Sequence, residues 1–518
     1  MIGVTLAQAT FNAPHLEYGA LSPMLVVWSA ATLGVLVEAV VPREYRWLSQ
    51  VSIAFTGLAG ALAAVVLLAG TAKTVAVDTI AVDGPALFLQ GTLLALAIAS
   101  LLFVAERSVD TGGGAFVQQA SVLPGSSDER RMLAAGGQQT EVYPLVMFSV
   151  GGMLMFASAN NLLAMFVALE VLSLPLYLLC GLARRRRLLS QEAAVKYFLL
   201  GSFSSAFFLY GLAMVYGYAG TLDLGRIQNK AQVATGSDAL LYIGIALLGV
   251  GLLFKVSAAP FHTWTPDVYQ GAPTPITAFM AAGTKVAAFG ALLRVFYVAF
   301  GPTQWDWRPV LWGVAILTMV VGSVLALTQT DIKRMLAYSS IAHAGFLTTG
   351  VLAYNRDGLA GTMFYLVTYG FATVAAFAIV SLVRDPYGEA THLSQWRGLG
   401  RRSPVLAVAF TFLLLAFAGI PMTSGFMGKF AVFKAAINGG AVPVVVVALV
   451  MSAVAAFFYL RVVVLMFWQE PAEDGPTVAV PSLFTAGAIA LGLAVTVVLG
   501  VVPGPVLDLA HRAAVFVP

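Results

Sequence analysis

Cysteine is nearly absent from this sequence, and its few histidines are scattered. The single cysteine is Cys180, whereas iron–sulfur clusters need several thiolates and structural zinc sites need a set of cysteines and histidines. No two histidines are three or four residues apart, so no helix can present a histidine pair to a metal. The histidines are His15, His262, His343, His392 and His511. We therefore expect no metal ion and no iron–sulfur cluster in this chain.

Nucleotide-binding motifs are missing as well. No G-x-G-x-x-G follows a segment typical of a strand. The dipeptide Gly428–Lys429 lacks both the upstream glycine and the following Ser or Thr of a phosphate-binding loop. We therefore expect no cofactor in this chain. If the chain takes part in a redox enzyme, the redox groups belong to its partners.

Charged residues are also scarce, and long hydrophobic runs take their place. Only 10% of the 518 residues are charged and 59% are hydrophobic, with a mean hydropathy of +0.88, whereas soluble proteins carry about 25% charged residues. The apolar residues form continuous blocks of about 20 residues, the length of a membrane-spanning helix. They lack the alternation of a β-barrel. The fold class is therefore an all-α polytopic membrane protein with about 14 transmembrane helices, in the blocks 21–41, 49–70, 84–106, 142–158, 161–182, 191–219, 237–259, 272–299, 309–328, 332–353, 358–383, 404–437, 442–468 and 481–502.

Lysine and arginine are distributed unequally between the loops. Loops after odd-numbered blocks hold fifteen of these residues, and the loops on the other side hold six. Because cytoplasmic loops carry the excess of Lys and Arg, both termini are expected on the non-cytoplasmic side. The run Arg184–Arg187 fits this rule better than a nucleic-acid or lipid site, since it directly follows a block. The N-terminus has no basic segment before its first apolar stretch, so the first helix is expected to be retained. The polar loop 107–141 is predicted to be mobile and cytoplasmic.

Ionisable residues inside the apolar blocks are the unusual feature of the sequence. A charge at the centre of a span costs about 2.5–3.5 kcal/mol on insertion scales. Arg294 and Lys434 lie near block ends, where snorkelling explains them. For Lys255, Lys285 and Glu170 we predict a proton relay, because burial disfavours the charged form of a lysine and a nearby carboxylate favours it. The alternative is a buried salt bridge that fixes helix packing.

Two of the blocks are interrupted by proline. Lys255 is followed by Pro260 in "SAAPFHTWTP", and Lys429 is preceded by Pro421 in "FAGIPMTSGFMGK". Each proline removes a helical hydrogen bond, and the small neighbours allow the backbone to unwind. Broken helices in corresponding halves of a membrane protein indicate an ion site.

The charged positions also indicate an internal repeat. The pairs with a common separation of 173 to 176 residues are Glu170 with His343, Lys255 with Lys429, and Lys285 with Arg461. They divide the core into two units of five helices, and since five is odd, the second unit enters the membrane from the opposite side. The predicted divisions are an N-terminal part (1–141), a first repeat (142–302), a second repeat (303–468) and a C-terminal part (469–518).

Three long motifs resemble those of one family. They are "HTWTPDVYQGAPTPITAFMAAGTK" at 262–285, "TDIKRMLAYSSIAHAGF" at 330–346 and "AGIPMTSGFMGKF" at 418–430. In this order they resemble motifs of the antiporter-like membrane subunits of respiratory complex I, the NADH:quinone oxidoreductase. The resemblance covers about residues 142–468. The form "VYQGAPTP" and the lysine at position 429 are similar to the N type of these subunits rather than the L and M types.

The resemblance implies a role for each matching position. Glu170 matches the glutamate of the family's fifth helix, Lys255 the lysine of the broken seventh helix, and Lys285 the lysine of the eighth. His343 matches a polar link on the tenth helix, and Lys429 matches the ionisable residue of the broken twelfth helix, on the exit side. Three further candidates with less defined roles are Lys196, His262 and Arg461. His262 is either a gate or a cap of the helix break.

The function implied by the resemblance is proton translocation in a bacterial inner membrane, coupled to electron transfer from NADH to quinone elsewhere in the complex. FMN, the iron–sulfur clusters and quinone would then belong to partner subunits, and the neighbours would be subunits M and K. One alternative is a subunit of a multisubunit cation/proton antiporter or of a membrane-bound hydrogenase. Another is a scaffold in which the buried charges only pair with one another.

Overall fold

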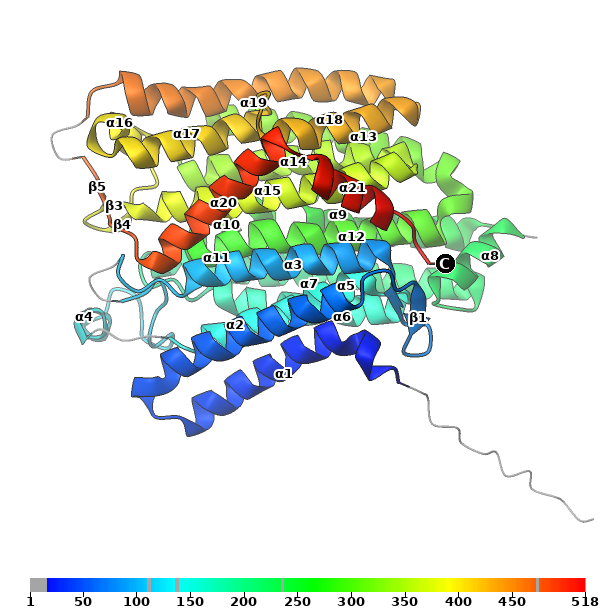
Figure 1. The fold of residues 1–518 in the computed structure, drawn as a ribbon, viewed down its shortest axis with the longest axis horizontal. Coiled ribbons are helices and arrows are strands. Elements are labelled where there is room, and N and C mark those ends of the chain that lie inside the picture. Colours follow the sequence, from blue (N-terminus) through cyan, green and yellow to red (C-terminus); the bar gives the residue numbers. More distant parts are fainter. Residues whose placement is uncertain (1–15, 110–112, 136–138, 234–236, 472–474, 518) are drawn as a thin grey trace, which may run out of the picture.

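The computed structural model of the protein describes residues 16–109, 113–135, 139–233, 237–471 and 475–517. It is a bundle of long helices that run side by side, with short strands and helices at its two ends (Figure 1). The first fifteen residues lie outside the described part, so the prediction about the N-terminal segment is not addressed by it.

Three long helices form the N-terminal part of the bundle. They are α1 (Tyr18–Val40), α2 (Arg43–Leu67) and α3 (Gly84–Val104). The short antiparallel strands β1 (Lys73–Val75) and β2 (Ile80–Val82) connect α2 to α3. The side chain of Asp83 accepts a hydrogen bond from Ala86 N at 3.0 Å, and Pro85 follows it. A capping carboxylate followed by proline is a typical start of a helix.

The next group of helices includes the first broken helix. It comprises α5 (Val142–Ser158), α6 (Leu162–Cys180), α7 (Arg187–Ala219), α8 (Leu224–Gln232), α9 (Ala239–Val256), α10 (Trp264–Gly271), α11 (Thr274–Phe279), η1 (Met280–Thr284), α12 (Lys285–Arg294) and η2 (Val295–Ala299). The segments η1 and η2 are π-helical turns within one run from α11 to η2. Helix α5 ends at Ser158 and α6 begins at Leu162, so the predicted blocks 142–158 and 161–182 are two separate helices.

The second broken helix lies in the last group. This group comprises η3 (Gly301–Thr303), α13 (Gln304–Thr328), α14 (Ile332–Ala353), α15 (Arg356–Leu382), η4 (Leu393–Trp396), α16 (Leu399–Arg402), α17 (Pro404–Ala418), α18 (Ser424–Asn438), α19 (Val442–Trp468), α20 (Leu483–Val501) and α21 (Gly504–Ala513). A small sheet of order β4-β3-β5 joins β3 (Val383–Asp385), β4 (Gly388–Glu389) and β5 (Thr477–Val478).

Twelve helices of the described part are long and apolar enough to cross a membrane. Two shorter apolar helices, α5 and α17, coincide with two further predicted blocks. The all-α membrane fold is therefore confirmed, whereas the number of fourteen and the inverted repeats stay predictions. Both proline breaks are present, because α9 ends at Val256 before α10 begins at Trp264, and α17 ends at Ala418 before α18 begins at Ser424.

The core of the bundle is formed by helices that are apolar on all sides. The most apolar windows of the run from α11 to η2 and of α15 are 100% buried, and that of α14 is 94% buried. The corresponding windows of α19 and α20 are only 33% buried. A helix that is hydrophobic all round belongs in an interior. The central helices α11–α12, α14 and α15 therefore provide the water-excluded surroundings of the charged residues described below.

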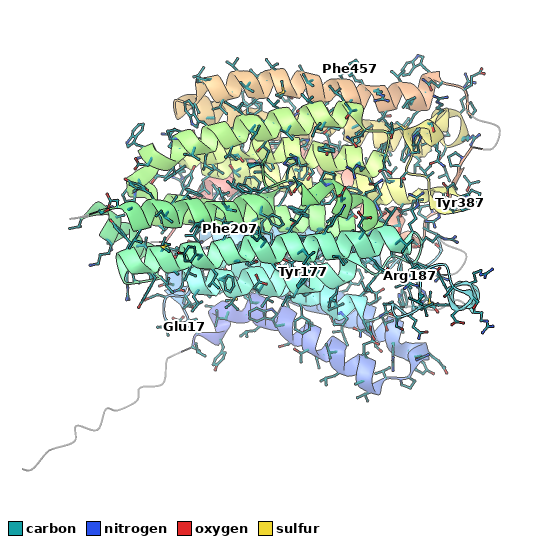
Figure 2. The ribbon with its side chains drawn as sticks, turned by 180° about the vertical axis from the view of Figure 1, so that it is seen from behind. Glu17, Tyr177, Arg187, Phe207, Tyr387 and Phe457 are labelled. Carbon is teal, nitrogen blue, oxygen red and sulfur yellow. The ribbon has the colours of Figure 1, made fainter. Side chains whose placement is uncertain are left out.

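The arginine-rich loops gather at one end of the bundle, which we call the basic end. Figure 1 shows α4 (Ser127–Ala135), α16 and β3 to β5 at this end, and α8, β1 and α21 at the other. In Figure 2, Arg187 and Tyr387 lie at the basic end and Glu17 lies at the opposite end. The described residues of loop 107–141 pack on this end, since Val117 N donates to Leu182 O at 2.8 Å and Arg187 forms an ion pair with Glu129 at 3.4 Å.

Candidate functional site

Lys255 lies at the end of the first broken helix, away from any carboxylate. It occupies the last turn of α9 and is only 3% exposed. Ser257 ends the helix with a left-handed φ of 65°. The Lys255 Nζ atom donates to Tyr197 Oη at 3.3 Å and lies 5.1 Å from the centre of the Tyr197 ring and 5.7 Å from that of Tyr177. Aromatic faces and a hydroxyl therefore surround this ammonium group, as in cation–π sites.

Glu170 is the acidic residue that the sequence predicts to act with Lys255, but the two side chains form no direct ion pair. It lies on α6 two turns before Tyr177. Its Oε1 atom is buried and has no hydrogen-bond partner among the described residues. Its charge acts on Lys255 through space. A buried carboxylate oxygen without a hydrogen-bond partner is costly. The charge of Glu170 is therefore not neutralised by a direct partner and can influence nearby ionisable groups.

Lys285 reaches back to the break that follows Lys255. It begins α12, directly after the π-helical turn η1, and is 1% exposed. Its Nζ atom donates to Val256 O, the last carbonyl of α9, at 3.0 Å. The free carbonyls at a helix C-terminus carry partial negative charge and stabilise a cation. The helix break thus supplies the electrostatic partner that no carboxylate provides.

His343 stands between hydroxyl groups near the middle of α14. Its Nδ1 atom lies 2.7 Å from Tyr365 Oη and its Nε2 atom 3.3 Å from Tyr459 Oη. Tyr459 in turn shares a hydrogen bond with Ser339. The imidazole is 2% exposed. Because each ring nitrogen can donate or accept, this group can exchange a proton with either tyrosine.

Lys429 contacts the second helix break in the same way as Lys285 contacts the first, by donating to the last carbonyls of the broken helix. It lies on α18, is 5% exposed, and its Nζ atom donates to Phe417 O at 3.0 Å and Ala418 O at 2.9 Å, the last carbonyls of α17. It also donates to Ser452 Oγ at 2.8 Å. A cavity of about 380 Å³ between α18 and α19 reaches Lys429. The Phe417 ring, whose backbone carbonyl accepts from Lys429, lies 5.7 Å from the His343 ring.

The contacts of the lysines resemble one another in a different combination from the one that residue spacing predicts. Lys255 precedes its break, whereas Lys429 follows its own. The lysine whose contacts match those of Lys429 is Lys285, since each donates to the last carbonyls of a broken helix. The pairing of the two halves by residue spacing stays a prediction.

The remaining candidates lie outside this buried group. Lys196 is 40% exposed and forms ion pairs of 2.6 Å with Glu192 and Asp267. Arg461 is exposed and donates to Leu327 O at 2.9 Å. His262 lies in the first break, and its Nδ1 atom is buried without a partner among the described residues. The two break prolines, Pro260 and Pro421, are exposed.

Arg294 does not snorkel to an interface, and that interpretation of the sequence is wrong. It is fully buried and forms an ion pair of 2.7 Å with Asp83, which is fully buried too. Lys434, by contrast, is exposed, as expected for a residue near a span end. Hydropathy places Arg294 near the end of its block, but the C-terminal Phe516 covers it, with its ring 4.8 Å from the guanidinium, and Val517 N donates to Asp83 at 3.0 Å.

The sequence argument missed the buried tyrosines, which supply most of the polar contacts of this site. Tyr197, Tyr365 and Tyr459 are each 1% exposed or less. A usable signal existed, because a tyrosine inside an apolar span needs a partner for its hydroxyl. Among the residues that the structure describes, no three His, Cys, Asp or Glu side chains form a group that could hold a metal ion.

Broken helices that end on buried lysines, within a bundle of membrane-spanning helices, define an antiporter-like membrane subunit. The chain belongs to the family described as NADH:quinone oxidoreductase/Mrp antiporter, TM, which it matches over residues 159–456. It is 64% identical over 508 residues to NADH-quinone oxidoreductase subunit N of Parafrankia sp., covering 98% of this chain and 97% of the relative. The predicted resemblance to the N type of complex I subunits is confirmed.

Two solved structures share the fold. A chain of respiratory complex I from Thermus thermophilus is 37% identical, with a TM-score of 0.76 over 94% of this chain and 99% of that chain. A chain of the Mrp complex from Dietzia sp. has a TM-score of 0.80 over 96% and 97% of the two chains, at 22% identity. The second likeness concerns the fold alone.

Proposed function

We propose that this chain translocates protons as a membrane subunit of NADH:quinone oxidoreductase, through Glu170, Lys255, Lys285, His343 and Lys429. The observation that carries the proposal is that three buried lysines have no counter-ion. Neither Lys255, Lys285 nor Lys429 forms an ion pair with any described residue, and all are 5% exposed or less. A scaffold of buried salt bridges would pair these charges, because an unpaired buried charge is costly.

The geometry supports a relay in which each protonation state depends on the next. Helix-end carbonyls stabilise the protonated forms of Lys285 and Lys429 without fixing them as a carboxylate would. In the proposed path, His343 and its two tyrosines connect these lysines, because the imidazole can pass a proton in either direction. Loss of a proton at one lysine lowers the repulsion felt at its neighbour, so charge changes propagate along the row.

The wider setting of this proposal follows from the relatives. NADH oxidation would occur in partner subunits that hold FMN, iron–sulfur clusters and quinone, and this chain would contact the subunits of types M and K. The basic end would face the cytoplasm, by the excess of Arg and Lys in its loops, with both termini on the other side. The units 142–302 and 303–468 would each provide one half of the proton path.

The test replaces Lys285 and Lys255 separately by methionine in the assembled enzyme. Methionine keeps the length of the side chain and removes the proton-carrying amine. We expect proton pumping in proteoliposomes to fall at least about tenfold, which corresponds to a rate-limiting barrier higher by about 1.4 kcal/mol. NADH:quinone reductase turnover should fall with it, because the two reactions are coupled.

The matched control is Lys230→Met, which removes an exposed lysine of α8, outside the buried group and its cavity. It should leave pumping unchanged. Full pumping by a normally assembled Lys285→Met enzyme would show that the buried lysines serve packing only. Co-purification of the chain with a flavin- and iron–sulfur-containing assembly distinguishes the oxidoreductase from a multisubunit cation/proton antiporter.

A further inference from the structure

A fourth buried lysine, at the basic end, is not explained by the relay described above. Lys333 lies in the first turn of α14, and its position next to a loop suggests an exposed residue in the sequence. In the structure it is only 2% exposed. Its Nζ atom donates to Ala272 O at 3.0 Å, in the connection between α10 and α11. Asp331 and Arg186 are the other charged groups that face it, together with Glu389.

Lys333 is joined to the protein surface by consecutive hydrogen bonds. Its Nζ atom donates to Thr274 Oγ1 at 3.0 Å, and Thr274 Oγ1 donates to Glu389 Oε2 at 2.6 Å. The Nζ–Oε2 distance is 3.6 Å, and the Glu389 side chain is 20% exposed. A carboxylate, a hydroxyl and an amine in contact form a path along which a proton can move by exchange of hydrogen bonds.

Water can reach the outer end of this path. A cavity of about 80 Å³ is lined by Glu389, Thr274 and Lys333, together with arginines of the basic end. A single water needs roughly 10–15 Å³ of such space. The cavity can therefore hold several waters beside the Glu389 carboxylate.

The inner end of the path lies against the segment that leads to Lys285. Lys333 holds the connection that precedes α11, and the continuous run from α11 through η1 reaches Lys285 at the start of α12. The packing thus places Lys333 between the cavity at the basic end and the helical run that carries Lys285.

We propose that Glu389, Thr274 and Lys333 form a proton-uptake path that supplies the row of buried lysines from the basic end. Glu389 takes a proton from water in the cavity. The protonated carboxyl then donates to Thr274 Oγ1 while the threonine hydroxyl gives its own proton to neutral Lys333. One O–H bond breaks and one N–H bond forms, the carboxylate is restored, and no electrons are transferred. This inference rests on the proposed function, because it assigns the source of the protons that the row carries.

The decisive variant is Thr274→Val, which keeps the side-chain shape and removes the bridging hydroxyl. We expect proton uptake to become rate-limiting, so that pumping falls at least about tenfold; positioned proton-transfer groups commonly contribute 10²–10⁴-fold. The ratio of the pumping rate in H₂O to that in D₂O should also increase, which a purely structural defect would not produce. Thr274→Ser keeps a hydroxyl and should restore both values to those of the unmodified enzyme.

Thr277→Val is the matched control, because Thr277 is equally buried one turn further along and its hydroxyl contacts only the backbone carbonyls of Tyr269 and Pro273. It should pump normally. If Thr274→Val fails to assemble, Glu389→Gln provides the same test, since glutamine accepts the Thr274 hydrogen bond but cannot carry the proton.

The Lys285→Met enzyme, measured beside these variants, separates the two proposals. The uptake path alone would be overturned if Lys285→Met lost pumping while Thr274→Val and Glu389→Gln pumped normally. The D₂O effect would then also be unchanged in the latter two variants. Normal pumping in Lys285→Met would remove the proposed relay itself. Reduced pumping in Thr277→Val as large as that in Thr274→Val would also overturn the uptake path, because the effect would then be one of packing.

Discussion

At the scale of single residues, the buried charged side chains have two different kinds of partner. Lys255, Lys285 and Lys429 contact neutral hydroxyls and carbonyls. Arg294, in contrast, faces the carboxylate of Asp83. An arginine keeps its proton beside a carboxylate, whereas a lysine held by neutral groups can change its protonation state. The Arg294–Asp83 pair therefore serves packing, and the three lysines are able to take part in proton transfer.

The Asp83–Arg294 pair gives a prediction about stability. Asp83→Asn leaves the fully buried Arg294 without its counter-charge, and breaking such a pair typically costs about 3–5 kcal/mol. We expect a lower melting temperature and a lower yield of the assembled subunit. The double variant Asp83→Asn/Arg294→Met removes both charges and should recover most of the loss. A double variant as unstable as Asp83→Asn would mean that the pairing of charge is not the cause.

At the scale of helices, close approach between α5 and α6 sets the position of Glu170. A side-chain carbon added at Gly152 of α5 would lie 2.4 Å from Leu172 N and 2.8 Å from Leu172 Cα on α6. Ser149 Oγ, one turn away, donates to Leu172 O at 3.0 Å. The backbone of α6 therefore rests directly on α5, two residues from Glu170.

Gly152→Ala should consequently push α6 away from α5. Overpacking of this kind costs about 1–3 kcal/mol, and we expect reduced assembly together with reduced pumping, because Glu170 moves relative to Lys255. Gly249→Ala is the control, since an added carbon at Gly249 of α9 meets no atom within 4 Å. Assembly is measured by the amount of intact complex on a native gel. Equal assembly of the two variants would contradict the close approach.

At the scale of the whole molecule, hydrogen bonds join the N-terminal helix α3 to the C-terminal helix α20. Glu106, just after α3, accepts hydrogen bonds from Ser482 N at 3.1 Å and Ser482 Oγ at 2.6 Å, just before α20. It also accepts from Ser108 N at 2.7 Å. Burial alone would raise the pKa of Glu106, but the hydrogen bonds from Ser482, Thr485 and Ser108 outweigh it and lower the pKa to about 2.

This lowered pKa predicts a dependence of stability on pH. The stabilisation by ionised Glu106 is complete above the ordinary value of 4.5 and is lost as the pH falls from there to about 2. Glu106→Gln lacks this contribution at every pH. We expect the difference in melting temperature between the unmodified and Glu106→Gln proteins to be constant from pH 7 to 5 and to shrink below pH 4. A difference that stays constant down to pH 3 would show that Glu106 does not link α3 to α20 through its charge.

The sequence by itself determined the membrane class, the helical fold, both proline breaks and three of the buried lysines, Lys255, Lys285 and Lys429. Those features depend on composition and on neighbours along the chain, because the cost of a charge in a span and the effect of proline on a helix are local. Only the tertiary structure decided the partner of each charge. Lys285 contacts a carbonyl 29 residues away, Thr274 a carboxylate 115 residues away and Arg294 a carboxylate 211 residues away. Such contacts follow from how whole helices pack, and neither hydropathy nor residue spacing contains that information.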